Sequence, residues 1–169
     1  MRFGLMTNEK RSWSKVGERT RLPNQMEYKN RYLYSAVCPI TGESVHIIGL
    51  SEATTKTTNL FLDEINKQHP NIHNIIIWDN ASFHKPKVLH TKENLSICPL
   101  PSYGQELNPV ERLFGEFRKA TANKIHKDID TIEKLLHEEV LVWINDKDRM
   151  KKLVYWDYFK KQLEYSYKI

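Results

Sequence analysis

The chain has 169 residues, enough for a hydrophobic core, and we expect residues 1–169 to form a single domain. Hydrophobic residues make up 40% and charged residues 28% of the sequence, which excludes a disordered chain, a collagen-like repeat and an integral membrane protein. Two cysteines, Cys38 and Cys98, without metal-ligand spacing exclude a disulfide framework and a zinc ribbon. Since the N-terminus also lacks the apolar stretch of a signal peptide, we expect a cytoplasmic protein.

Positive charge is concentrated near the N-terminus. The chain has 26 Lys and Arg against 21 Asp and Glu, and residues 1–37 alone hold eight basic and three acidic residues. Trp13 and three tyrosines are interleaved with these cations. Such a pattern favours nucleic acid, through phosphate contacts and base stacking, and a solvated basic surface is the alternative.

The first half of the sequence predicts strands and one helix. Residues 31–38 and 44–50 are rich in β-branched and aromatic residues and flank a turn sequence, which predicts a hairpin. Residues 57–68 follow as a helix, and residues 1–6 are a further candidate strand.

Two more strands are predicted before the sequence becomes helical. The run NIIIWD at residues 74–79 is too compact for a helix and is typical of a strand buried on both faces. Residues 95–100 form the next strand. The order of strands, a helix, more strands and then helices indicates an α/β fold with a helical C-terminus.

The second half predicts two amphipathic helices. The first begins with Asn108 as N-cap, Pro109 at the first helical position and Glu111 completing a capping box. Asp130 and Glu133 repeat this signature at the start of the second helix. The apolar stripe of the first helix is Val110, Leu113, Phe114, Phe117, Thr121 and Ile125, and that of the second is Ile132, Leu135, Leu136, Val140, Trp143 and Ile144.

Two carboxylates stand at positions suited to chemistry. Asp79 ends the most apolar strand, where open α/β sheets place ligands, and Glu111 lies at a helix start. Each also has a purely structural interpretation, as a turn residue and as a capping residue. Together they would hold a hard cation such as Mg²⁺, and Gly115, one turn after Glu111, would leave open space beside it.

His84 and Lys85 follow Asp79 closely enough in the sequence to flank a phosphate group. A surface turn is the alternative interpretation.

These residues together resemble a known family. The motif Trp78-Asp79-Asn80-Ala81 with His84, then the segments LPSY at residues 100–103 and LNPVERLFG at residues 107–115, resemble the catalytic domain of mariner-like bacterial insertion-sequence transposases. The N-terminal segment RFGLMTNEKRSWSKVGER resembles the first strand of that family and the basic loop after it.

The resemblance implies an RNase-H-like fold of the DDE (retroviral integrase) superfamily, with a mixed sheet flanked by helices. It implies that two Mg²⁺ or Mn²⁺ ions support DNA cleavage and strand transfer at transposon ends. Asp79 matches the second catalytic acid and Glu111 the third, so both are expected metal ligands. The expected DNA contacts are Lys10, Arg11, Trp13, Lys15, Arg19, His84 and Lys85. The expected partners are transposon-end and target DNA, with a second copy or a full-length transposase, on the nucleoid in the cytoplasm.

One departure from the family pattern concerns the first catalytic Asp. The family carries it in an Asp-Glu pair just ahead of the segment that resembles Arg2-Phe3-Gly4-Leu5-Met6, and this sequence has Met1 there. We therefore expect a shortened first strand, an N-terminally incomplete domain and a chain that is inactive alone. The alternative is a non-catalytic DNA-binding or subunit-association fragment of a transposase.

Overall fold

The computed structural model describes residues 1–7, 10–19, 21–78, 93–101, 104–155 and 161. Three antiparallel strands form one sheet in the order β1 (Arg2–Gly4), β2 (Asn30–Val37) and β3 (Ser44–Leu50). Two parallel strands, β4 (Asn74–Trp78) and β5 (Leu95–Pro99), form a second sheet. The predicted hairpin is confirmed as β2 and β3, and β1 confirms the candidate strand at the N-terminus.

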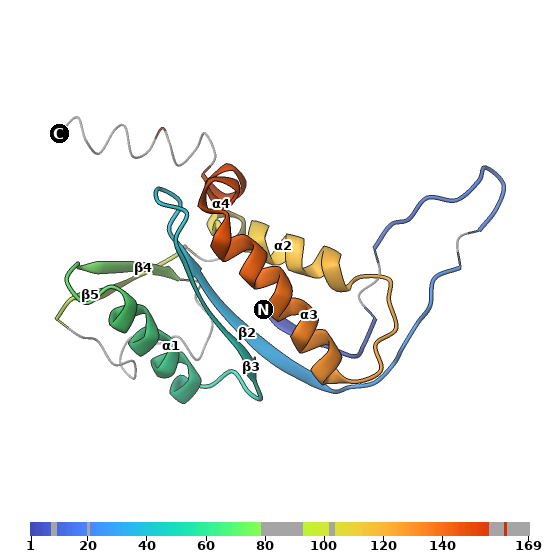
Figure 1. Cartoon of the computed structure of the whole chain (residues 1–169), viewed down its shortest axis with the longest axis horizontal. Helices are drawn as coiled ribbons and strands as arrows, with labels where there is room; N and C mark the ends of the chain where they lie inside the picture. Colours follow the sequence, from blue (N-terminus) through green and yellow to red (C-terminus); the bar gives the residue numbers. More distant parts are fainter. Residues whose placement is uncertain (8–9, 20, 79–92, 102–103, 156–160, 162–169) are drawn as a thin grey trace.

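The helices of the described residues pack against the sheets (Figure 1). Helix α1 (Thr55–Gln68) lies beside β4 and β5, whereas α2 (Val110–Thr121), α3 (Ile129–Asn145) and α4 (Lys147–Val154) lie over the three-stranded sheet. A 3-10 turn, Gln105–Leu107, precedes α2. No helix among the described residues is long and apolar enough to cross a membrane.

Alternation along β2 and β3 divides the core into two clusters. Leu33 and Ile48 face α2, α3 and α4, where Leu113, Phe117 and Leu136 are fully buried. The intervening residues of both strands, such as Tyr34 and Val45, face α1 and pack with Phe61 and Trp78, and the rings of Phe61 and Trp78 meet edge to face. The three-stranded sheet therefore has helices on both faces, because side chains in a strand alternate between faces.

The apolar sequence of β4 predicts a strand buried on both faces, and this prediction is wrong. Ile75 is 67% exposed and Ile77 is exposed as well, whereas Ile76 packs with the α1 cluster. A continuous apolar strand is buried on both faces only when other elements pack against each face of its sheet. Among the described residues, elements pack against one face of β4.

The first predicted amphipathic helix is shorter than its apolar stripe. α2 ends at Thr121, and Asn123 adopts a positive φ of 55° in the following loop. Ile125 therefore lies beyond the helix and is 61% exposed. The stripe prediction holds for Val110, Leu113, Phe114 and Phe117, which are buried.

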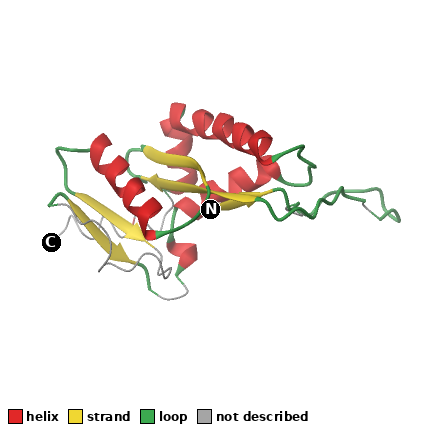
Figure 2. Cartoon of the chain, turned by 90° about the horizontal axis from the view of Figure 1, so that it is seen from below, coloured by secondary structure: helices red, strands yellow, loops and turns green. Residues whose placement is uncertain are grey.

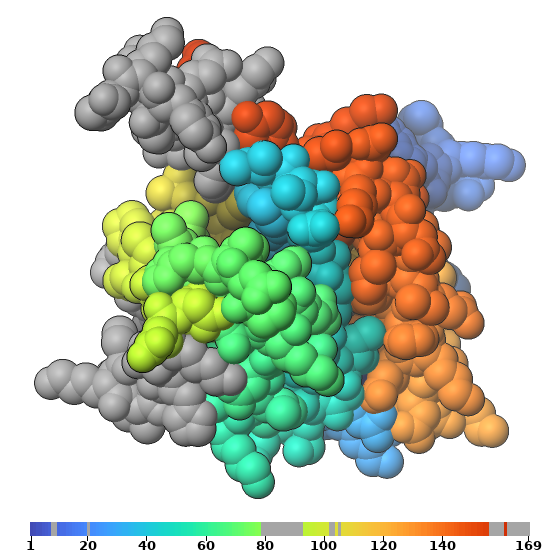
Figure 3. All heavy atoms as spheres, turned by 60° about the vertical axis from the view of Figure 1, so that its left-hand side comes forward, coloured from blue at the N-terminus to red at the C-terminus, as the bar shows by residue number. Residues whose placement is uncertain are grey.

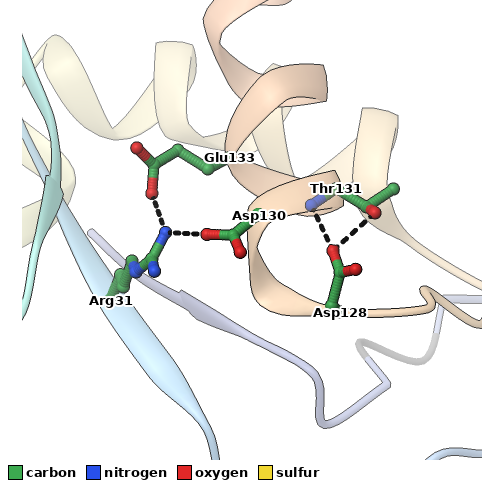
Figure 4. Close-up of polar contacts among 5 residues, drawn as sticks. All are labelled: Arg31, Asp128, Asp130, Thr131 and Glu133. Carbon is green, nitrogen blue, oxygen red and sulfur yellow. Dashed lines mark hydrogen bonds and ion pairs between the residues drawn. The ribbon is translucent and has the colours of Figure 1, made fainter.

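The start of α3 differs from the predicted cap (Figure 4). The N-cap is Asp128, whose Oδ1 accepts hydrogen bonds from the Thr131 backbone N–H at 2.7 Å and from its hydroxyl at 2.6 Å. Asp130 and Glu133 instead bind the guanidinium of Arg31 on β2. Asp130 and Glu133 therefore connect α3 to β2. The local sequence pattern cannot distinguish this contact from a helix cap.

His46 on β3 gives the stability of the fold a pH dependence. Burial lowers its pKa to about 4 from the ordinary 6.5, because the charged imidazolium is disfavoured inside the protein. Its contribution is therefore complete above pH 6.5 and is lost as the pH falls towards 4. Between pH 7 and pH 4.5 the wild-type chain loses unfolding free energy, and we expect His46→Gln to reduce this loss by up to about 2 kcal/mol, measured by urea denaturation. An equal loss in the wild type and the variant would contradict this assignment.

Candidate functional site

Glu111 lies in the first turn of α2, at the exposed start of a helix anchored in the core. Pro109 already has helical dihedral angles, and Asn108 Oδ1 accepts a hydrogen bond from the Val110 backbone N–H at 3.2 Å. The predicted capping box is wrong, since the N-cap residue is Pro109, which makes no side-chain capping hydrogen bond. The Glu111 carboxylate is paired with Arg118 at 3.4 Å.

The surroundings of Glu111 leave its carboxylate accessible. The Glu111 side chain is 41% exposed and that of Arg118 is 40% exposed. A Cβ placed on Gly115 would meet no atom within 4 Å, so the space one turn along the helix is open, as predicted. A carboxylate in this position can accept a cation or a ligand without rearrangement of the core.

The end of β4 lies beside the start of the segment that leads to α2. The Leu100 backbone N–H, just after β5, donates to the Trp78 carbonyl at 2.6 Å, so the segment leading to α2 leaves the sheet beside the last residue of β4. Asp79 is the next residue in the sequence. Asp79, His84 and Lys85 themselves lie outside the described residues.

The carboxylate of Glu111 is a suitable ligand for a hard divalent cation. Glu111 offers carboxylate oxygens, which Mg²⁺ and Mn²⁺ prefer over nitrogen or sulfur. Within the described part of the chain, no three His, Cys, Asp or Glu residues are grouped so that they could hold a metal ion. A metal site at Glu111 therefore needs a carboxylate from outside the described residues, such as Asp79.

The cationic N-terminal segment projects from the body as a long extension, here called the basic arm (described residues 6–7, 10–19 and 21–29; Figures 1 and 2). Residues 11–19 and 21–24 are all exposed, and this part includes Arg11, Trp13, Lys15 and Arg19. Near its tip, the Glu18 backbone N–H donates to the Lys15 carbonyl at 3.0 Å. Four of the predicted DNA-contacting side chains thus share one exposed extension.

Two polar contacts hold the root of the arm on the loop between α2 and α3. The Asn123 amide accepts from the Lys10 backbone N–H at 2.9 Å and donates to the Lys10 carbonyl at 3.1 Å. The Gln25 amide makes the same pair of bonds to the His126 backbone, at 3.1 and 3.0 Å. Lys10 itself is partly buried at this root.

A hollow beside this root adds residues that the sequence analysis missed. It has a volume of about 500 Å³ and lies between β1, the arm and the last turns of α2. Lys29, Arg118 and Lys124 line it, together with Glu27. The sequence does contain a signal for the pairing of Arg118 with Glu111. The two residues are seven positions apart, which places them two helical turns apart on the same face of the helix.

Comparison with known proteins places the chain in a family. The family model described as DDE superfamily endonuclease matches residues 1–133. The chain belongs to the DDE superfamily endonucleases. An uncharacterized protein of Sinorhizobium fredii (strain NBRC 101917 / NGR234), y4pE/y4sA, is 32% identical over 103 residues, which cover 60% of this chain and 76% of that protein.

Solved structures of Mos1 transposase share the fold of this DDE domain. The Mos1 strand transfer complex matches with a TM-score of 0.62 and 18% identity, over 91% of this chain and 51% of that chain. The pre-cleavage Mos1 transpososome matches with a TM-score of 0.59 and 15% identity, over 91% and 53%. The chain thus spans about half the length of these transposase chains, and its mixed α/β architecture is that of their RNase-H-like catalytic domain.

Removing the ion pair at Glu111 provides a test of its accessibility to metal. The Arg118 guanidinium competes with any cation for this carboxylate, and an exposed ion pair is worth about 0–1 kcal/mol. We expect Arg118→Gln to strengthen Mn²⁺ binding to the DDE domain by about two- to fivefold in calorimetry. The control is Lys119→Gln, which breaks the neighbouring pair with Glu116 at 2.6 Å. Equal Mn²⁺ affinity in both variants would show that Glu111 is not a ligand.

Proposed function

We propose that this DDE endonuclease domain is the catalytic domain of an insertion-sequence transposase, which cleaves DNA at transposon ends and joins the cut ends to target DNA. The observation that carries the proposal is the position of Glu111. It is an accessible carboxylate at the start of a core-anchored helix, and the segment that leads to this helix begins beside the strand end that Asp79 follows.

In this proposal, Asp79 and Glu111 hold two Mg²⁺ or Mn²⁺ ions. When bound, such ions activate the attacking oxygen and stabilise the leaving oxygen at phosphorus. The contribution of the chain is to fix the two carboxylates and to keep cations near the phosphate. His84 and Lys85 would flank the phosphate beside Asp79.

DNA is the proposed partner of the basic arm. Its exposed cations would neutralise backbone phosphates, and Trp13, which is fully exposed, presents a flat face to bases. Mos1 has been solved in a paired-end complex with its left transposon end, at a TM-score of 0.56 and 11% identity over 90% of this chain and 52% of that chain. We propose by analogy that this domain acts on DNA as a homo-oligomer or beside a full-length transposase.

None of the acidic residues of the proposed metal site lies on the first strand, β1. β1 consists of Arg2, Phe3 and Gly4, so the family's first catalytic Asp has no counterpart on it. We therefore propose that the 169-residue chain binds DNA without cleaving it. The exposed basic arm favours this DNA-binding role as the second candidate function.

The salt dependence of DNA binding tests the role of the arm. We expect replacement of Lys10, Arg11, Lys15 and Arg19 by Ala to reduce the slope of log K against log salt by up to about 0.9 for each lost phosphate contact. The measurement is fluorescence anisotropy with a labelled duplex at several salt concentrations. The matched control replaces Lys56, Lys67, Lys134 and Lys152, which lie on α1, α3 and α4. An unchanged slope in the arm variant would contradict the proposal.

Plasmid nicking tests the catalytic assignment. We expect no Mn²⁺-dependent nicking of supercoiled DNA by the 169-residue chain. We expect nicking by a chain with a short apolar strand ending in Asp-Glu ahead of Arg2, and its loss on Asp79→Ala or Glu111→Gln. Nicking by the unextended chain that Asp79→Ala abolishes would contradict the need for a third acid. A folded, extended chain that does not nick would contradict the catalytic proposal itself.

A further inference from the structure

Part of β3, residues 46–48, lines a groove between two helices. Among the described residues, β3 pairs with β2 alone, so one hydrogen-bonding edge of this strand has no neighbouring strand. In Figure 3, β3 (cyan to teal) is visible at the surface between α1 (green) and α3 (orange). The groove has a volume of about 640 Å³, and β3, α1 and α3 all contribute to its walls.

The groove surrounds the edge of the strand and does not lie on one face of the sheet. Ile47 packs with the α1 cluster, and Ile48 packs with the cluster of α2, α3 and α4. Both residues line the groove. Since consecutive side chains of a strand point to opposite faces, the backbone edge between them forms the floor.

A bulge fixes how far this edge can pair with another strand. The register with β2 changes between Tyr34, opposite Ile47, and Tyr32, opposite Leu50. Gly49 has a φ of +85° there and closely approaches the Glu133 carboxylate. Bulges interrupt strand pairing, so the regular edge comprises residues 44–47.

The walls of the groove combine apolar surface with negative charge. On α3, Leu141 is 44% exposed and Ile144 is also exposed. The charged residues that line the groove are Glu64, Glu138, Lys134 and Glu133, and the Glu133 carboxylate is already paired with Arg31. Carboxylates outnumber cations among these lining residues, so the groove is less suited to DNA than the basic arm.

We propose that the groove binds an extended segment of a partner polypeptide with alternating apolar and Lys or Arg side chains, which adds to β3 as a further strand. The backbone of the segment would pair with residues 44–47. One set of its side chains would cover Leu141 and Ile144, and its cations would approach Glu64 and Glu138. This site is separate from Glu111 and does not depend on the nuclease assignment.

The test uses an acetylated and amidated eight-residue peptide of alternating Val and Lys with the full 169-residue chain. We expect it to bind at least tenfold more tightly than a peptide of alternating Val and Glu, and to slow amide hydrogen exchange at residues 44–47. Leu141→Lys should weaken binding at least tenfold. The matched control is Leu60→Lys, on α1 outside the groove, where Leu60 is 52% exposed. Glu111→Gln should leave peptide binding unchanged.

Three results would overturn the proposal. One is equal affinity for the two peptides, and another is equal peptide affinity in Leu141→Lys and Leu60→Lys. The third is a dimer in sedimentation experiments that Leu141→Lys dissociates, since a second copy would then occupy the groove.

Discussion

The packing of α2 against β1 and β2 is the constraint on which the site depends. Leu113 and Phe117 are fully buried with Leu33 of β2, and this contact fixes the helix on the sheet. Glu111 and Arg118 belong to the opposite, solvent-facing side of the same helix. Because core side chains interdigitate closely, the helix cannot rotate or slide without loss of packing, so the carboxylate is held in place before any ligand binds.

The same helix also supports the basic arm. The loop that follows α2 presents Asn123 and His126 to the arm root, and the amides of Asn123 and Gln25 each make two bonds to backbone groups. Helix α2 thus positions the Glu111 carboxylate at its start and supports the basic arm at its end. A nuclease requires this combination, since carboxylates that bind metal ions need nearby cations to hold the phosphate backbone.

Local patterns in the sequence identified most elements, and the failures have physical causes. The hairpin, α1 and β5 follow from composition and turn residues. The α3 cap was assigned to Asp130, because a capping signature cannot reveal that Arg31, 99 residues away, takes this carboxylate. The apolar sequence of β4 could not show that Ile75 and Ile77 face outwards, since burial depends on layers contributed by distant residues.

The candidate site was predictable in part. The motif predicts Glu111 as a metal ligand, and its accessibility is compatible with that prediction; the exposure of Arg11, Trp13, Lys15 and Arg19 agrees with the predicted basic loop. Arg118 was not predicted, because the motif marks the carboxylates and does not mark their counterions. The groove at β3 was also missed, since it arises where two helices far apart in the sequence flank one strand edge.

The central claim is that Asp79 and Glu111 bind the same metal ions. The most direct test is Mn²⁺ calorimetry on Asp79→Asn, Glu111→Gln and the double variant, each checked for a wild-type circular dichroism spectrum. If the carboxylates share the ions, the double variant will bind no more than about 0.5 kcal/mol more weakly than the weaker single variant. If the two losses in binding free energy simply add, the carboxylates act at independent sites and the account is contradicted.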